Sequence, residues 1–354
     1  MDLGRAPARQ RRRWRWATVG GLLGVVVLAA LWVGFGLLDP PSLAPFAAWR
    51  LPTATAPAPA GAQVRVTFLG VATMLVDDGE TALLTDGFFT RPGKLATLLG
   101  RIAPDPVAIR RALDAAKVHR LAAIFVVHSH YDHALDAPLV AMHTGALLVG
   151  SPSTANVARG LGFPEDRFRL VPPNEPMHFG RFTVTMIPSR HFPHGVAMGE
   201  IEAPLRPPAR ASAWKEGGSY SVLIEHPLGR LLVQGSAGWR AGALDGRRAD
   251  VVALGIGALG TRDATYFDGY YHGVIGAVRP RCVIPIHYDD FTLPLDTDLE
   301  PMPSLLDDVP AALRALERRV RSEPGIGMGL LPPLAPVVLF GDGAVTCGPS
   351  LGKH

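Results

Sequence analysis

The sequence HSHYDH at residues 128–133 restricts the fold of this chain more than any other feature. It places three imidazoles and one carboxylate within six positions. It directly follows LAAIFVV at 121–127, an apolar run typical of a buried strand. A lone buried histidine is usually an ordinary packed side chain, but this many polar groups at one strand end are costly to desolvate without an ion. The run therefore predicts a metal site at the end of a strand.

The spacing of these four side chains separates them into two pairs. Alternate residues of a strand point to the same face, so we expect His128 and His130 to reach one ion together. Asp132 and His133 follow where the chain turns toward a helix, and they can reach a second position nearby. Imidazole nitrogen with one carboxylate is a ligand set typical of zinc, and it also suits iron or manganese. We therefore expect one or two zinc ions as cofactor.

Short strand-like runs begin at Val64 and continue through most of the chain. They lie at 64–70, 73–77, 81–86, 121–127, 146–150, 182–188, 219–225, 230–234, 250–255 and 281–287. Helical stretches fall between some of them, at 107–117 and 307–321. Strand hairpins early and mixed units later predict an α+β fold, with sheet packed on sheet and helices outside. No internal repeat or second linker interrupts residues 64–348, which we expect to form one domain.

The segment 17–38 is apolar throughout and has no charged residue over about 22 positions, enough to cross a bilayer as a helix. Six arginines precede it within residues 1–16, and the next basic residue is Arg50. The positive-inside rule then predicts a cytoplasmic tail at 1–16, a single-pass anchor in the inner membrane and a periplasmic domain. Contact with membrane lipid through this helix is the partner that the segment predicts.

Two other interpretations of the N-terminus are weaker. A cleaved signal peptide would have an apolar core of about 7–15 residues, shorter than this one. Arg12-Arg13 is only a weak indication of a twin-arginine export signal. Residues 39–63 are rich in Pro and Ala and show neither strand nor helix periodicity, so they are expected to form a semi-extended linker from the anchor to the domain.

The basic character of the chain does not indicate a nucleic-acid partner. Residues 1–16 carry six arginines and one aspartate, a net charge of +5, whereas the whole chain carries +4. The remainder therefore has a net charge of −1, which offers no surface for tracking phosphates. The basic tail belongs to membrane topology and anionic lipid.

The two cysteines, Cys282 and Cys347, allow two interpretations. They can pair in an oxidising compartment, or remain as two free thiols in or near strands. Cys282 lies five residues before His287 on a predicted strand, and this odd separation places it on the opposite face, away from any ligand at His287. The sequence contains no Cys-x-x-Cys, so a thiolate zinc site is not expected.

The pattern His-x-His-x-Asp-His after a strand resembles the signature of the metallo-β-lactamase superfamily, and further landmarks of that family occur in order across 64–348. The resemblance implies an αββα sandwich with the site along one edge of the two sheets. Asp86 at the end of TALLTD resembles the family's early aspartate, which would hold a ligating imidazole in its tautomer. His191 in MIPSRHF and His287 in IPIHYDDF resemble the later ligands.

The resemblance implies two ligand sets. The first metal would take His128, His130 and His191, and the second would take Asp132, His133 and His287. Most of the superfamily bridges the two metals with an aspartate in a Gly-Asp-Thr-Gly turn, but the turn here is GSAG, with Ser236 at that position. The missing charge predicts weaker binding of the second metal.

Three more residues near the motifs have open roles. Asp289 and Asp290 could replace the missing negative charge, or serve only as surface or loop-capping carboxylates. His194, three residues after His191, could line the pocket, although an ordinary surface role is the alternative.

The combination of HYDH, SRHF and HYDDF is most similar to the lactonase-like and N-acyl-phosphatidylethanolamine phospholipase D-like branch. β-Lactamases usually carry Gly-His-Thr at the third ligand, which is absent here. A bound metal lowers the pKa of water to about 7, and Asp132 would orient that water as the catalytic residue. The resemblance thus implies hydrolysis of a lipid phosphodiester or a small ester or lactone at the membrane surface. The alternatives are a periplasmic β-lactamase-type amidase and a non-catalytic, metal-stabilised envelope protein.

Overall fold

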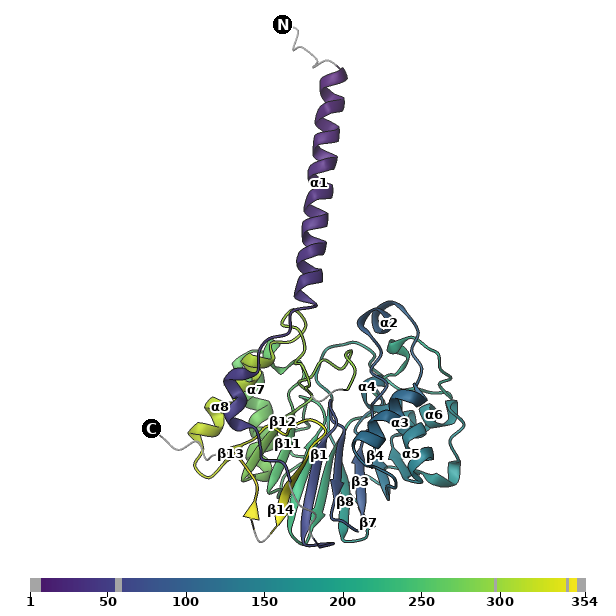
Figure 1. Ribbon diagram of the computed structural model, residues 1–354, viewed down its shortest axis with the longest axis vertical. Coiled ribbons are helices and arrows are strands. Elements are labelled where there is room, and N and C mark those ends of the chain that lie inside the picture. Colours follow the sequence, from purple (N-terminus) through teal and green to yellow (C-terminus); the bar gives the residue numbers. More distant parts are fainter. Residues whose placement is uncertain (1–7, 55–58, 296–297, 342–343, 349–354) are drawn as a thin grey trace.

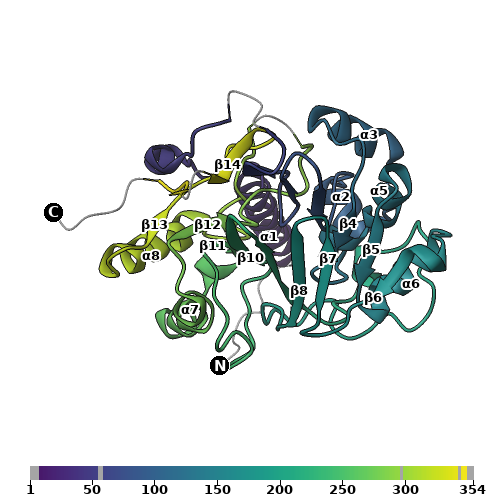
Figure 2. The same ribbon diagram turned by 90° about the horizontal axis from the view of Figure 1, so that it is seen from below.

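The computed structural model describes residues 8–54, 59–295, 298–341 and 344–348. Two β-sheets face each other, and helices cover their outer sides (Figures 1 and 2). Within the described ranges, one sheet has eight strands in the order β15-β14-β1-β2-β3-β4-β5-β6, and the other has seven in the order β13-β12-β11-β10-β9-β8-β7. This mixed α/β two-sheet sandwich agrees with the layered fold predicted for 64–348.

The strands of the first sheet are β1 (Gln63–Phe68), β2 (Met74–Asp77), β3 (Ala82–Thr85), β4 (Ala123–Phe125), β5 (Leu147–Gly150), β6 (Phe168–Leu170), β14 (Pro336–Gly341) and β15 (Ala344–Val345). Those of the second are β7 (Pro176–Phe179), β8 (Phe182–Pro188), β9 (Tyr220–His226), β10 (Gly229–Gln234), β11 (Val251–Gly255), β12 (Cys282–Ile286) and β13 (Gly327–Met328). The helices are α1 (Ala8–Gly36), α2 (Lys94–Leu99), α3 (Pro106–Ala115), α4 (Tyr131–Ala134), α5 (Ala137–Thr144), α6 (Pro152–Gly160), α7 (Ala264–Tyr271) and α8 (Val309–Ser322).

Alternation along the strands of the first sheet builds two apolar layers. In β3, Leu83 belongs to the core between the sheets, and Leu84 belongs to a second core beneath the helices. The next strand repeats this pattern with Phe125 and Ile124. Because both faces are buried, these strands are mostly apolar, as expected for strands covered on both sides.

In each sheet, strands that run in the same direction bring their carboxyl ends to one edge. β3, β4 and β5 run parallel in the first sheet, and β10, β11 and β12 run parallel in the second. β8 also runs parallel to β10, because each is antiparallel to β9. The carboxyl ends of β8, β10 and β12 therefore share one edge of their sheet.

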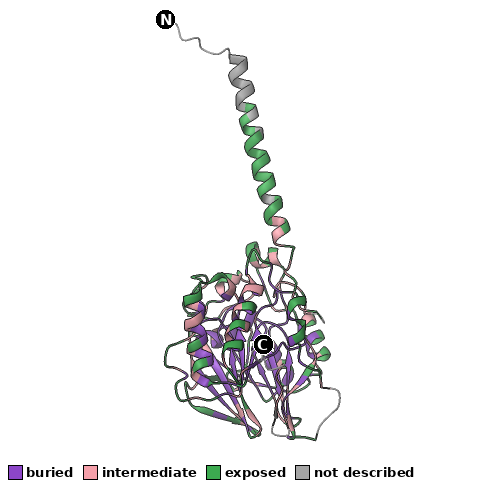
Figure 3. Ribbon diagram, turned by 90° about the vertical axis from the view of Figure 1, so that its left-hand side faces the viewer, coloured by how far each residue is buried: buried purple, intermediate pink, exposed green. Residues whose placement is uncertain are grey.

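Helix α1 stands out from the domain (Figure 1), and most of its described side chains are exposed (Figure 3). The exposed large apolar residues include Leu22, Val26 and Trp32. Within the described part of the chain, no helix combines the length and the apolarity that a membrane crossing requires. The membrane-spanning helix predicted at 17–38 is therefore not found.

The segment 39–63 differs in part from the linker that its composition predicts. Its residues Ala44–Trp49 form a short 3₁₀ helix, with Phe46 and Trp49 buried in the core between the sheets. Leu51 is buried with them, and its amide donates a hydrogen bond to the carbonyl of Leu330. Apolar side chains at irregular spacing therefore fasten this stretch to the domain, a contact that periodicity does not predict.

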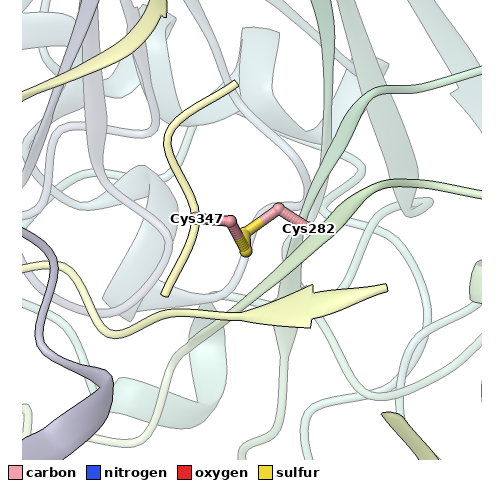
Figure 4. The surroundings of a disulfide bond; sticks show 2 residues. All are labelled: Cys282 and Cys347. Carbon is pink, nitrogen blue, oxygen red and sulfur yellow. A yellow bond between two sulfur atoms is a disulfide. The ribbon is translucent and has the colours of Figure 1, made fainter. Parts of the chain in front are cut away.

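Cys282 in β12 and Cys347 after β15 form a disulfide bond (Figure 4). The pairing decides between the two interpretations that the sequence allowed. It links the segment after β15 to β12, the strand next to the edge of the second sheet. Cys282 is fully buried and takes no part in the histidine cluster, as its register relative to His287 predicted.

Candidate metal centre

The predicted ligands lie on loops and on the short helix α4, all of which follow the carboxyl ends of strands from both sheets. HSHYDH follows β4, His191 follows β8, and His287 follows β12 directly. Strand β4 ends at Phe125, however, so His128 lies in a loop and His130 is the residue before α4. The prediction that strand alternation aligns these two rings is wrong; the turn into α4 brings them together instead.

The first cluster contains three imidazoles. His128, His130 and His191 each offer one ring nitrogen, and these three atoms lie within 4.8 Å of one another. A main-chain carbonyl fixes two of the rings: His130 Nε2 is 3.1 Å from the oxygen of Ala197, and His191 Nδ1 is 2.7 Å from that of Phe192. The other nitrogen of each ring is thereby left for a metal.

The second cluster adds a carboxylate to two imidazoles. Asp132, His133 and His287 also bring one ligand atom each within 4.8 Å of one another. Asp132 Oδ2 lies 3.4 Å from His133 Nε2 and 3.3 Å from His287 Nε2. The two clusters adjoin, since the ring centroids of His128 and His133 are 3.9 Å apart.

Two buried ring nitrogens indicate that these clusters suit a metal. His128 Nε2 and His133 Nε2 are shielded from solvent and have no hydrogen-bond partner among the described residues. A buried polar atom without a partner costs about 1–3 kcal/mol. A divalent ion coordinated by imidazole nitrogen and carboxylate oxygen would remove that cost in both clusters. This set of ligand atoms fits zinc, iron or manganese.

Burial keeps the imidazoles of the first cluster neutral. Desolvation lowers the pKa of His130 to about 4 and that of His191 to about 3. It also lowers the pKa of His128 well below the usual value, with the neighbouring imidazoles adding to the effect. Neutral imidazole is the form that binds a metal, so these ligands are ready at neutral pH.

The second cluster carries charge instead. Burial alone would raise the pKa of Asp132, but His133 and His287 outweigh burial and lower it, so the carboxylate is ionised. Burial alone would lower the pKa of His133, but Asp132 and Asp86 outweigh it and raise this pKa. A proton therefore competes with a metal for His133 more strongly than for the first cluster.

Asp86 lies where its resemblance to the family's early aspartate places it. One carboxylate oxygen is 2.8 Å from His133 Nδ1, and the other accepts a hydrogen bond of 2.9 Å from the amide of Val127. The residue has a φ of 56°, a left-handed conformation that non-glycine residues adopt rarely and often at functional sites. It thus joins the end of β3 to the loop after β4 and orients His133 with Nε2 toward the cluster.

Ser236 contacts the loop that carries His191. Its Oγ accepts a hydrogen bond of 3.0 Å from the amide of Phe192, so it supports the loop that carries His191. Gly238 is needed in the same turn, because a Cβ there would lie 2.5 Å from the carbonyl oxygen of His191. Ser236 also lines the cavity over the clusters.

Asp289 and Asp290 are buried and already paired. Asp289 forms an ion pair with Arg91, both side chains being fully buried, and Asp290 pairs with Lys94. Asp290 also caps its own loop by accepting the amide of Thr292 at 3.0 Å. Neither belongs to a cluster, so the structure gives no support for a replacement of the missing charge, and neither is a surface carboxylate.

The pair Arg91–Asp289 acts on the second cluster indirectly. Asp289 Oδ1 accepts the amide of Val71 at 2.7 Å, and the carbonyl of Val71 accepts the amide of His287 at 2.7 Å. His287 has a φ of 60°, so this contact holds a rare backbone conformation. Sequence reasoning missed Arg91 and Val71, because nothing local to either indicates a partner about 200 residues away.

A cavity of about 520 Å³ lies over both clusters. Its walls are mostly apolar, with Leu98, Phe192, Val196, Trp214, Phe291, Met302 and Leu306 among the lining residues. His194 is exposed and also lines it, with its ring centroid 4.7 Å from that of His191. Its Nδ1 accepts the amide of Val196 at 2.9 Å, so His194 lies at the mouth as a pocket residue outside the two clusters.

Comparison with known proteins finds relatives that are named metal-dependent hydrolases. No family model matches the chain. A UPF0173 metal-dependent hydrolase of Heliobacterium modesticaldum is 28% identical over 246 residues, 64% of this chain and 84% of the relative. Its counterpart in Pyrobaculum arsenaticum is 25% identical over 236 residues, 65% of this chain and 86% of the relative.

A solved structure supports the fold. Igni18, described as a novel metallo hydrolase from Ignicoccus hospitalis, superposes with a TM-score of 0.50 at 17% identity, covering 78% of this chain and 97% of that one. At that identity the likeness concerns the fold alone. The two-sheet sandwich, the His and Asp clusters at its edge and the named relatives agree with one another. The chain is therefore similar to proteins named metal-dependent hydrolases, and its two-sheet sandwich is consistent with the metallo-β-lactamase fold.

Proposed function

We propose that the protein hydrolyses a lipid phosphodiester, or an ester or lactone with an apolar group, at a membrane surface. The observation that carries the proposal is the position of both ligand clusters beneath a largely apolar cavity. When bound, divalent metals such as zinc would lower the pKa of a water and polarise the substrate's carbonyl or phosphoryl oxygen. Resemblance to the lactonase-like and phospholipase D-like branch favours the same class of substrate.

The residues of the clusters divide the work in this proposal. His128, His130 and His191 would hold one ion, and Asp132, His133 and His287 would hold the other. The ionised Asp132 would also orient the attacking water, because its carboxylate lies between the two rings of its own cluster. Asp86 keeps His133 in one tautomer, which fixes the nitrogen that faces the cluster.

The apolar residues around the mouth of the cavity favour a substrate that has an apolar part. Most of the exposed large apolar residues of the domain lie in the three segments that border its mouth, namely Leu95, Leu98 and Leu99 on α2, Val196 and Met198, and Leu305 and Leu306. Exposed apolar residues grouped in this way are typical of a site for lipid or another apolar partner. Scattered single residues would not have this meaning.

The arrangement of α1 supports action at a lipid surface. The helix ends close to the rim, where a Cβ added at Gly36 would lie 3.5 Å from Leu305 Cδ2. Figure 1 shows α1 and α2 at the same end of the domain. We propose that α1 attaches the protein to the inner membrane and that the domain lies on the periplasmic side. The Cys282–Cys347 disulfide favours an oxidising compartment of this kind.

A substrate panel tests the proposed activity. The full-length, zinc-loaded protein is assayed with a generic phosphodiester, esters and lactones of increasing acyl length, and nitrocefin. We expect turnover of phosphodiesters or esters that rises with chain length, and none of nitrocefin. Turnover of nitrocefin alone would instead indicate an amidase, and no turnover by a metal-loaded protein would favour a non-catalytic envelope role.

Cell fractionation tests the proposed location. We expect the full-length protein in the membrane fraction, and a reporter fused after Leu351 to behave as periplasmic. A soluble protein of full length, or a shortened soluble form, would contradict the attachment through α1.

A further inference from the structure

Asp307 carries a carboxylate oxygen that has no hydrogen-bond partner in the part of the chain that the structure describes. The residue is 4% exposed and lines the cavity over the metal clusters. Its Oδ2 accepts a hydrogen bond of 2.8 Å from the amide of Ala258, whereas its Oδ1 is buried and has no partner among the described residues. An unpartnered buried carboxylate oxygen is costly, so its position at the cavity wall requires an explanation.

Helix capping does not supply that explanation. Helix α8 begins at Val309, and its N-cap is the neighbouring Asp308, whose side chain accepts the amide of Ala311 at 2.9 Å. Asp307 is therefore not the N-cap of α8, the usual role of an acidic residue just before a helix. The adjacent aspartates have different surroundings: one satisfies the helix end and the other faces the cavity.

The other acidic residues of the cavity wall are already occupied. Asp132 belongs to the second ligand cluster, and Asp289 is paired with Arg91. Among the described acidic residues that line the cavity, this leaves Asp307 with the free acceptor. Burial raises the pKa of Asp307 to about 6, so it is mostly ionised at neutral pH.

The position of Asp307 is close to the reacting region. The amide that holds it belongs to Ala258, which follows Gly257, and a Cβ at Gly257 would lie 2.7 Å from His287 Nδ1. The loop at 257–258 therefore contacts both a predicted ligand of the second metal and the carboxylate of Asp307. A group bound at Asp307 would consequently lie beside the second cluster, within the same cavity.

We propose that Asp307 is a substrate-recognition residue, whose free Oδ1 accepts a hydrogen bond from an ammonium or hydroxyl group close to the scissile bond. This inference rests on the proposed hydrolase function and narrows its substrate class. The substrate is an amphiphile, with its apolar part against the cavity walls and a hydrogen-bond donor on its polar part. A hydrogen bond to a charged group discriminates by about ten- to a hundredfold against an analogue without the donor.

Matched phosphonates test the inference on the full-length, zinc-loaded protein. 2-Aminoethylphosphonate and 2-hydroxyethylphosphonate carry the donor, and propylphosphonate has nearly the same size without it. Binding is measured by calorimetry for the wild type, Asp307→Asn and Asp308→Asn. Asp308→Asn is the matched control, because it removes the same charge one residue away and asparagine is equally good as an N-cap. Zinc content is measured in all three proteins.

In the wild type and in Asp308→Asn, we expect at least one donor-bearing probe to bind about ten- to a hundredfold more tightly than propylphosphonate. In Asp307→Asn this preference should fall to threefold or less, with the affinity for propylphosphonate and the zinc content unchanged. A wild type that shows no preference, or a preference that survives in Asp307→Asn, overturns the inference. Loss of the preference in a protein that hydrolyses nothing supports the role of Asp307 and counts against the proposed hydrolysis alone.

Discussion

The two ligand clusters lie side by side but are built in different ways. In the first, all three imidazoles are neutral, and main-chain carbonyls orient two of them, such as that of Ala197 beside His130. In the second, an ionised carboxylate joins two imidazoles, one of which is oriented by a buried acid, Asp86. The first cluster is therefore neutral, whereas the second depends on charged groups. This contrast predicts that the two sites will respond differently to mutation, to protons and to added charge.

The largest effect is expected from His128→Ala. The variant loses an imidazole whose Nε2 is buried and unpaired, so the first ion becomes under-coordinated. Metal ions stabilise the transition state by several kcal/mol, so activity should fall by about 10³-fold or more. Steady-state kinetics and zinc content of the same preparation check this. His178→Ala, at an exposed site on β7, is the control. Activity of His128→Ala equal to that of the wild type would show that the metal centre is not needed for catalysis.

A smaller and more selective effect is expected from Asp86→Asn. The amide no longer favours the tautomer that directs His133 Nε2 to the cluster, and loss of such a partner typically costs about 10–100-fold in metal affinity or activity. The affinity of the second site should fall while the first site remains filled. Competition with a chelating dye measures both. Asp136→Asn, another buried carboxylate, which binds the amides of Phe89 and Thr90, controls for general destabilisation. Equal loss at both sites would contradict the comparison.

Acidification should also separate the two sites. The pKa values of His130 and His191 are lowered to about 4 and about 3, so protons do not compete with the first metal until the pH approaches those values. The pKa of His133 is raised, so this ligand gains a proton at a higher pH and releases the second metal first. Zinc per chain after dialysis between pH 8 and pH 3 should fall in two steps, with the second step near the lower end of this range. A single step, with both ions lost together, would disagree with these proton affinities.

The smallest effect is expected from Ser236→Asp. A carboxylate at this position adds a negative charge next to His191 and would offset the repulsion between two dications. The second zinc should bind more tightly, by roughly tenfold, without a necessary gain in turnover, because a bridging carboxylate also occupies metal positions. The measurement is zinc per chain along a chelator titration. Ser212→Asp, also on the cavity wall, controls for added charge alone. No change in Ser236→Asp would mean that this side chain does not reach the metals.

The part of the site that lies in one short stretch of sequence, HSHYDH, could be predicted from that stretch alone. HSHYDH lies within six residues, so its convergence depends on one turn, and the family resemblance added His191 and His287 in the right order. The layered fold was also predictable, because buried strands such as β11 and β12 are apolar runs of strand length. The limits of strands were less predictable. The apolar run 121–127 continues past the end of β4 at Phe125, and Val126 is buried there and donates a main-chain hydrogen bond of 3.0 Å to Val149.

The remaining features depend on contacts between distant segments. The pairing of Arg91 with Asp289 spans 198 residues, and neither local sequence indicates it. Asp307 precedes a helix, as many capping residues do. Only the structure shows that Asp307 lines the cavity and that its neighbour Asp308 caps the helix. Phe46 and Trp49 lie in a Pro- and Ala-rich stretch whose composition predicts a linker, yet they complete the core. Tertiary packing decided these three cases.

The most direct test of the account is metal stoichiometry combined with turnover. Zinc per chain is determined for the full-length wild type, His128→Ala and His287→Ala, and each preparation is assayed with the best ester or phosphodiester of the panel. We expect two zinc ions in the wild type and loss of the more weakly held ion in His287→Ala. Activity should be lost with the metal and restored when metal is added back to the wild type. A wild type that binds no stoichiometric divalent metal, or that keeps its activity after chelation, would contradict it.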